Sequence, residues 1–244
     1  MRIIPALAVL SLVACKTDSA SVERGSGDRA VANTSSARPR QAKLPLPTRT
    51  NALIIGVQVR AEMAWNDATA ANTPESWDLA AELFQRALAA CRDDCTELAY
   101  AMVLARKNAI SNDRSIVRPA EKPTEPQELP PRVEAFVDAA DTYVATAPSG
   151  NDEAVGISFL ASQQYNDYGW IDESTTRFAT IVLANPSHEV ALYSANLMLD
   201  AFNRSGRYDD LLRWARDLSA NAALMAAQPE LAELVATILA RAAN

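Results

Sequence analysis

The chain has 244 residues, of which 49% are hydrophobic, 22% charged and 6% aromatic, with a formal net charge of −7. It contains 47 alanines but only 7 glycines, a balance that favours helices because Ala loses no side-chain entropy in a helix. This composition disfavours β-sandwiches and barrels, and also nucleotide-binding α/β domains, which need clustered glycines. A single histidine leaves little material for a His-based metal site or catalytic triad.

Residues 1–14 have the pattern of a secretory signal, because Arg2 precedes an apolar stretch from Ile3 to Val13. This stretch is too short to span a bilayer, which takes about 20 residues. The sequence Leu12-Val13-Ala14-Cys15 resembles the lipobox of bacterial lipoproteins. The resemblance implies cleavage before Cys15 and a covalent lipid on that residue, which would anchor the chain in a membrane. An ordinary signal peptide with a chance cysteine is the alternative.

Residues 15–50 lack apolar periodicity, so they cannot bury enough apolar surface to offset the entropy of ordering. We predict a lipid-anchored, disordered tether. Residues 16–50 carry seven Lys and Arg against three Asp and Glu, whereas residues 51–244 carry 15 against 27. A basic tether suits anionic lipid or the envelope polymer, or serves only as a soluble linker. The acidic body disfavours nucleic acid as a partner.

From residue 51 onwards the apolar spacing follows the 3.6-residue period of a helix, and no segment favours a strand, which predicts an all-α fold. Thr73 and Pro74 supply an N-cap and a first-turn proline to the first clear helix. Further helices are expected over residues 96–110, 132–147 and 154–167. A last helix over residues 229–242 would cap the open end of a helical stack.

Helix-breaking turns recur at Gly169 and Gly206, 37 residues apart. Here the chain resembles the tetratricopeptide repeat, a helical hairpin of about 34 residues. The matching positions in the first unit are the two aromatic residues, the turn and the terminating proline: Tyr165, Phe178, Gly169 and Pro186. The resemblance implies a superhelix of stacked hairpins over residues 51–110 and 132–244. A generic helical bundle is the alternative.

The match is degenerate outside this unit. The following unit agrees at Phe202 and Gly206 but departs from the pattern at Ala215 and Ala223. An earlier second helix agrees at three positions, Ala80, Phe84 and Ala87.

Residues 111–131 interrupt the repeat pattern and contain five prolines: Pro119, Pro123, Pro126, Pro130 and Pro131. The segment is far longer than the roughly 2–8 residues that usually connect packed helices. It is therefore either a mobile insertion or a polyproline-like ligand segment.

If Cys15 carries lipid, Cys91 and Cys95 remain as a pair, which in an oxidising compartment predicts a disulfide across the turn Arg92-Asp93-Asp94. Two buried free thiols are the alternative. We expect no metal or other cofactor, because no second cysteine pair or His cluster exists. His188 is expected in the first turn of a helix capped by Ser187, with no catalytic role.

In the tetratricopeptide family, the first helices of the repeats line a groove that binds peptides. Carrying over the alignment places one set of groove residues on the helix before Gly169: Phe159, Gln163, Asn166 and Asp167. The next first helix supplies a second set: Tyr193, Asn196, Asp200, Asn203 and Arg204. Their amides suit main-chain hydrogen bonding to an extended peptide, and Arg204 suits a carboxylate. Solvated helix-face residues are the alternative for each of them.

These features together predict a non-catalytic, TPR-like scaffold anchored in a bacterial membrane. Lys16, which follows the lipobox cysteine, favours the outer membrane by the same resemblance, with the body facing the periplasm. The expected partner is another envelope protein or peptide. The alternatives are a subunit of a trans-envelope motility or secretion complex, and a cell-wall enzyme or its accessory.

Overall fold

The computed structural model describes residues 49–119 and 121–243. In this part of the chain every regular element is an α-helix and no strand is present, which confirms the all-α prediction. The signal, Cys15 and almost all of the tether lie outside the described residues. Within the described ranges, no helix has the length and hydropathy needed to cross a membrane.

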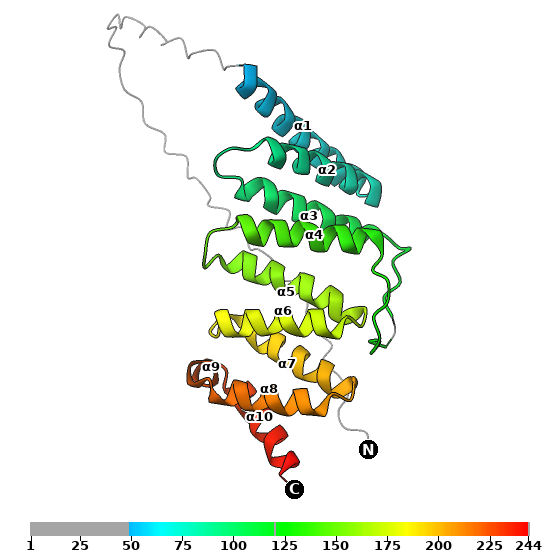
Figure 1. The fold of residues 1–244 in the computed structure, drawn as a ribbon. Helices are drawn as coiled ribbons and strands as arrows, with labels where there is room; N and C mark the ends of the chain where they lie inside the picture. Colours follow the sequence, from blue (N-terminus) through cyan, green and yellow to red (C-terminus); the bar gives the residue numbers. More distant parts are fainter. Residues whose placement is uncertain (1–48, 120, 244) are drawn as a thin grey trace, which may run out of the picture. The chain divides into compact units, whose positions relative to one another are not determined.

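Ten helices follow one another in the described part of the chain (Figure 1). They are α1 (Arg49–Ala71), α2 (Pro74–Ala90), α3 (Thr96–Asn112), α4 (Pro131–Thr146), α5 (Asp152–Asp167), α6 (Ile171–Ala184), α7 (Glu189–Arg204), α8 (Tyr208–Ala220), α9 (Ala222–Ala227) and α10 (Pro229–Ala242). From α1 to α8 each helix packs against the next one in the sequence. α10 then packs on α8 and α7, and α5 also contacts α7.

The start of α2 follows the predicted cap. Thr73 is the N-cap, and its hydroxyl accepts a hydrogen bond from the Ser76 amide at 3.3 Å. The Ser76 hydroxyl in turn accepts a hydrogen bond from the Thr73 amide. Asn72 precedes it in the left-handed region (φ 48°), which Asn tolerates better than most residues. Its side-chain oxygen accepts from the Trp77 indole at 3.1 Å. The turn between α1 and α2 is thus fixed by side chains adjacent in sequence.

The turns after α5 and α7 share one geometry. Gly169 and Gly206 have φ of +77° and +71°, values that favour glycine at the C-terminal end of a helix. In both turns the residue after the glycine donates its amide five residues back, to Tyr165 and Phe202 respectively, each at 2.9 Å. The hairpins α5–α6 and α7–α8 therefore end their first helices alike.

The core consists of two clusters of buried residues, one reaching from α1 into α5 and the other from α5 to α10. Alanines supply many of the contacts in the first cluster, because small side chains let helices approach closely. The fully buried alanines of that cluster are Ala61, Ala68, Ala80, Ala81, Ala99, Ala105, Ala109, Ala140 and Ala161. The abundance of alanine thus has a packing role.

Two local expectations need correction. α9 was not expected; Asn221 caps it, accepting from the Leu224 amide at 3.0 Å. The assignment of Ser187 as the cap of α7 is wrong, because His188 itself is the N-cap and its Nδ1 accepts from the Val190 amide at 3.2 Å. His188 has an extended backbone (ψ 144°), so the helix begins one residue later than expected.

Candidate functional site

The proline-rich segment between α3 and α4, here called the strap (residues 113–119 and 121–130), leaves the helical stack and returns to it. In Figure 1 it runs beside the ends of α5 and α6, away from the helices it connects. Its contacts reach residues on α5, on the α5–α6 turn and on α7. Together with Asn166, which bonds to Arg204, the contacted residues form the strap site: Asp167, Tyr168, Gly169, Trp170 and Arg204.

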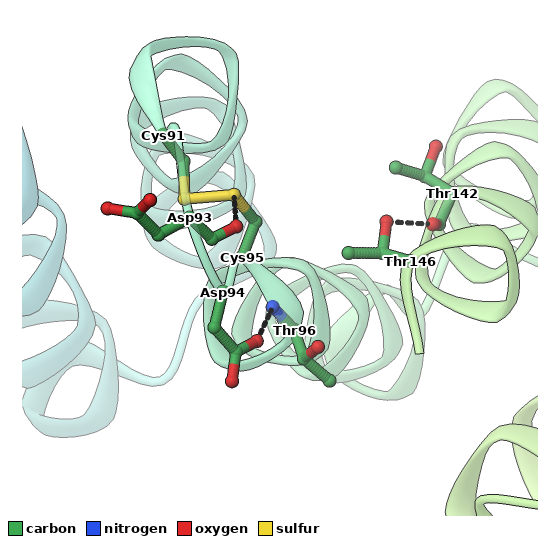
Figure 2. Close-up of a disulfide and its surroundings, with 7 residues drawn as sticks. All are labelled: Cys91, Asp93, Asp94, Cys95, Thr96, Thr142 and Thr146. Carbon is green, nitrogen blue, oxygen red and sulfur yellow. Dashed lines mark hydrogen bonds between the residues drawn. A yellow bond between two sulfur atoms is a disulfide. The ribbon is translucent and has the colours of Figure 1, made fainter. Parts of the chain in front are cut away.

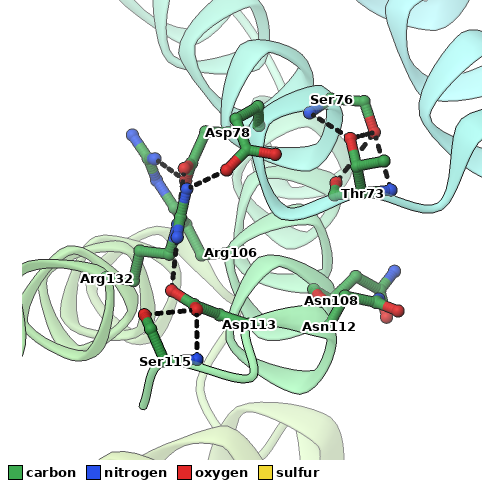
Figure 3. A network of polar contacts seen from close by, with 10 residues as sticks. Thr73, Ser76, Asp78, Arg106, Asn108, Asn112, Asp113, Ser115 and Arg132 are labelled. Carbon is green, nitrogen blue, oxygen red and sulfur yellow. Dashed lines mark hydrogen bonds and ion pairs between the residues drawn. The ribbon is translucent and has the colours of Figure 1, made fainter.

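Arg132, in the first turn of α4, holds the base of the strap (Figure 3). Its Nε donates to Asp78 at 2.8 Å and its Nη2 to Glu75 at 3.0 Å, both on α2. Its Nη1 bonds to Asp113, the first residue of the strap. Arg106 of α3 donates to the second oxygen of Asp78 at 2.8 Å. One guanidinium therefore ties α2, α4 and the strap together.

These contacts shift the protonation equilibria at the base of the strap. Hydrogen bonds from the Ser115 hydroxyl and the Arg132 guanidinium lower the pKa of Asp113 to about 2. The pKa of Arg132 is raised, chiefly by its hydrogen bonds to Asp78 and Asp113. The Asp113–Arg132 pair is thus charged throughout the neutral pH range.

The middle of the strap is held by its main chain. The Gln127 amide donates to the Tyr168 carbonyl at 2.9 Å, and the Gln127 carbonyl accepts from the Trp170 indole at 2.7 Å. Farther back, the Lys122 carbonyl accepts from Arg204 Nη1 at 3.2 Å. Main-chain bonds of this kind do not depend on which side chain the strap carries at these positions.

Charge complementarity adds to these bonds. Asp167, at the end of α5, lies 3.7 Å from Lys122 Nζ and 4.0 Å from Arg118 Nη1. Arg204 donates from Nε to Asp200 at 2.9 Å and from Nη2 to the Asn166 side-chain oxygen at 2.9 Å. The same guanidinium therefore bonds to α5, to its own helix and to the strap.

Gly169 gives the strap room to approach. A Cβ at this position would overlap the main-chain carbonyl of Glu125 and would lie 3.1 Å from Pro123 Cγ. At Gly206, the equivalent position of the next hairpin, a Cβ would meet nothing within 4 Å. Only the first of these two turns is therefore shaped around the strap.

The strap itself is not part of the core, because none of its described residues is buried. Three residues of the strap site, Asn166, Tyr168 and Gly169, are buried, and two of their polar atoms, Asn166 Nδ2 and the Tyr168 hydroxyl, have no hydrogen-bond partner. Burial also raises the pKa of Tyr168, so its hydroxyl stays neutral and retains its proton for donation. Buried polar groups in folded proteins are usually satisfied. The strap is thus an incomplete match to its site.

A cavity of about 690 Å³ lies between the strap, α2 and the start of α4. Its walls include Asp78, Asp113, Arg132 and Tyr168, along with prolines of the strap and the first proline of α4. Three of the charged groups in this cavity, Asp78, Asp113 and Arg132, already pair with one another. No group of three or more His, Cys, Asp or Glu side chains in the described ranges is placed to hold a metal ion.

The predicted groove residues divide into two groups. Asn166, Asp167, Asp200 and Arg204 come together at the strap, and each already has a partner in the chain. Asn203 is exposed near them. Sequence reasoning placed these residues in a ligand groove. The structure shows the strap in contact with two of them, Asp167 and Arg204, and Arg204 in turn bonds to Asn166 and Asp200.

The other groove residues lie nearer the starts of α5 and α7. Phe159 is buried and its ring packs against those of Phe178 and Tyr193, with centroids 6.0 and 6.4 Å away. Tyr193 is 43% exposed. Gln163 and Asn196 are half-buried, and the Asn196 side-chain oxygen is a third buried polar atom without a partner. We call Gln163, Tyr193 and Asn196, three residues of the predicted groove, the open groove.

Cys91 and Cys95 form a disulfide with Cα atoms 5.9 Å apart, at the turn between α2 and α3 (Figure 2). Asp94 within this turn accepts from the Thr96 amide at 3.1 Å, and this bond lowers the pKa of the Asp94 carboxyl. The bridge closes a very short loop, so it removes little entropy from the unfolded chain. Its role is to fix the corner of one hairpin.

The sequence did not identify three of the residues that hold the strap: Arg132, Lys122 and Trp170. Arg132 follows two prolines at a helix start, where a cation is unfavourable next to the positive end of the helix dipole. A cation at such a position indicates that acidic side chains lie close to it. Lys122 and Trp170 carried no comparable signal, because their contacts join residues far apart in the chain.

No family model, curated protein or solved structure shows a significant match to the chain.

Proposed function

We propose that this chain is a lipid-anchored scaffold that faces the periplasm and binds an extended segment of another envelope protein, with no chemistry of its own. The observation that carries the proposal is the strap site. There, α5, α7 and the α5–α6 turn hold a non-helical, proline-rich segment by main-chain hydrogen bonds and by a charge pair with Asp167. A surface that holds one such segment has the groups needed to hold another.

The arrangement of the helices supports a TPR-like stack. Two hairpins, α5–α6 and α7–α8, end their first helices with the same glycine turn, and α5 contacts α7 as neighbouring first helices would. Stacked hairpins present an extended surface built from side chains of successive first helices. Tyr193 and Asn196 precede Asp200 and Arg204 on α7, so we expect the open groove to continue the strap site along that surface.

The location rests on two features. The sequence Leu12-Val13-Ala14-Cys15, which resembles a lipobox, would imply export and a lipid anchor. The Cys91–Cys95 disulfide is of the kind that persists in oxidising compartments such as the bacterial periplasm. Anchor and disulfide both agree with an envelope partner.

The proposal is tested by photo-crosslinking in living cells. A photoreactive phenylalanine analogue replaces Tyr193 in the open groove, and in a matched variant it replaces Leu183 of α6, which is similarly exposed (51%). We expect position 193 to yield a discrete crosslinked protein that position 183 does not yield. Identical adducts from both positions, or none from position 193, would count against a binding role for this surface.

A further inference from the structure

We propose that the strap is a built-in ligand that a partner protein displaces, and that the displacing segment is non-helical, contains proline and carries a Lys or Arg. This inference rests on the proposed binding function and names the chemistry of the partner. It follows from the hydrogen bonds that hold the strap, from the buried polar atoms that the strap leaves without partners, and from the space for the strap at Gly169.

The contacts of the strap are ones that another chain can reproduce. Its carbonyls at Lys122 and Gln127 accept from Arg204 and from the Trp170 indole, and its cations face Asp167. None of its described side chains is buried, so its detachment exposes no core residue of its own. Segments with few buried apolar contacts open at a small fraction of the global unfolding free energy.

The base of the strap stays fixed during such an opening. Asp113 is bonded to Arg132, which also bonds to Asp78 and Glu75 on α2. The middle of the strap can therefore leave its site while α3 and α4 remain packed against each other.

The unsatisfied atoms indicate that the site is built for a better ligand. Asn166 is fully buried; its side-chain oxygen accepts from Arg204, but its Nδ2 has no acceptor. Tyr168 is only 4% exposed, and its hydroxyl also lacks a hydrogen-bond partner. Tyr168 lines the cavity beside the strap, so a segment that offers an acceptor to its hydroxyl would gain a hydrogen bond that the strap does not make.

The chemistry of the site selects the partner. Asp167 attracts a cation, and the guanidinium of Arg204 takes a main-chain carbonyl. The bare backbone at Gly169 accommodates a carbonyl and a proline, as it does Glu125 and Pro123 of the strap. Proline keeps a segment extended before it binds, which lowers the entropy lost on binding.

The experiment uses the full chain with the strap shortened, so that Ser115 joins Leu129 through Gly-Ser-Gly-Ser and the contacts of Arg132 remain. The probe is a fluorescein-labelled synthetic peptide with the sequence of residues 116–129. We expect saturable binding by fluorescence anisotropy to the shortened chain. Binding to the unmodified chain should be at least tenfold weaker, because its tethered strap competes at a high effective concentration.

Matched glycine variants identify the site. In the shortened chain, Gly169→Ala should weaken peptide binding at least tenfold, whereas Gly206→Ala should change it less than twofold. Both glycines have similar positive φ, so both variants carry the same backbone strain, and only Gly169 faces the strap. A peptide with Lys122→Glu should bind several-fold more weakly than the unmodified peptide. Equal losses from the two glycine variants would overturn the proposal.

A second variant keeps the test decisive if the shortened chain does not fold, as judged by circular dichroism. Gln127→Pro removes the amide that bonds to Tyr168, at a position outside every helix. This variant should bind the peptide at least threefold more tightly than the unmodified chain does, and no gain in affinity would refute displacement.

If the chain forms a dimer that Gly169→Ala abolishes, the site binds a second copy of the chain, which would overturn the partner assignment.

The two proposals fail separately. Crosslinking from Tyr193 without peptide binding at the strap site would retain the scaffold and remove the displaceable strap. Peptide binding without any crosslinked partner would retain the site and remove the envelope partner.

Discussion

Replacing Phe178 with alanine should lower the free energy of unfolding by about 3–5 kcal/mol, the range typical of a fully buried aromatic side chain. Phe178 is 0% exposed, and its ring packs 6.0 Å from that of Phe159, between α6 and α5. Truncation would leave a cavity in the second core cluster that rigid helices cannot fill by a small shift. Denaturant unfolding followed by circular dichroism measures the loss.

The control for this variant is Leu183→Ala on the same helix. Leu183 is exposed, so its truncation should change stability by no more than about 0.5 kcal/mol. Similar losses from the two variants would mean that α6 does not pack as described. Because Phe159 also contacts Tyr193, the Phe178→Ala variant should weaken crosslinking from position 193 as well.

Arg132→Met should cost about 2 kcal/mol of unfolding free energy and release the base of the strap. Arg132 is 26% exposed and donates to three carboxylates, those of Asp78, Asp113 and Glu75. Methionine retains most of the apolar stem but leaves Asp113 without its guanidinium, and hydrogen bonds to charged groups contribute about 1.5–3 kcal/mol. Asp78 retains Arg106, which limits the loss.

Arg86→Met is the matched control. Arg86 pairs with Glu82 at 3.9 Å on the exposed face of α2, and such pairs contribute about 0.3–0.5 kcal/mol. Arg132→Lys should recover only part of the loss, because an ammonium cannot span three separate carboxylates as a planar guanidinium does. A loss for Arg132→Met no larger than that for Arg86→Met would contradict its role as the anchor of the strap.

Much of the fold was accessible from local sequence signals. The Thr73 cap, the glycine at position 169 and the prolines at helix starts act within one turn of the chain, and the helices they bound were predicted closely. The cap of α7 was misassigned because Ser187 and His188 both offer an acceptor, and only the backbone conformation decides which one is used.

The candidate site could be predicted only in part from the sequence. Asn166, Asp167 and Arg204 were selected as groove residues because the repeat pattern places them on first helices. Their partners could not be predicted, since the bond from Arg204 to Lys122 joins residues 82 positions apart and depends on how the strap folds back. Gly169 was assigned a turn role, and its second role, room for Glu125, appears only when the strap is in place.

The measurement that tests the central claim most directly is hydrogen exchange at the Gln127 amide in the unmodified full-length protein. This amide donates to the Tyr168 carbonyl, so it exchanges only when the strap leaves its site. We expect it to exchange through local opening, at a free energy well below that of buried amides in α5 such as Ala161. Exchange of Gln127 only on global unfolding, with the same free energy as Ala161, would show that the strap is a fixed part of the fold and would contradict the account.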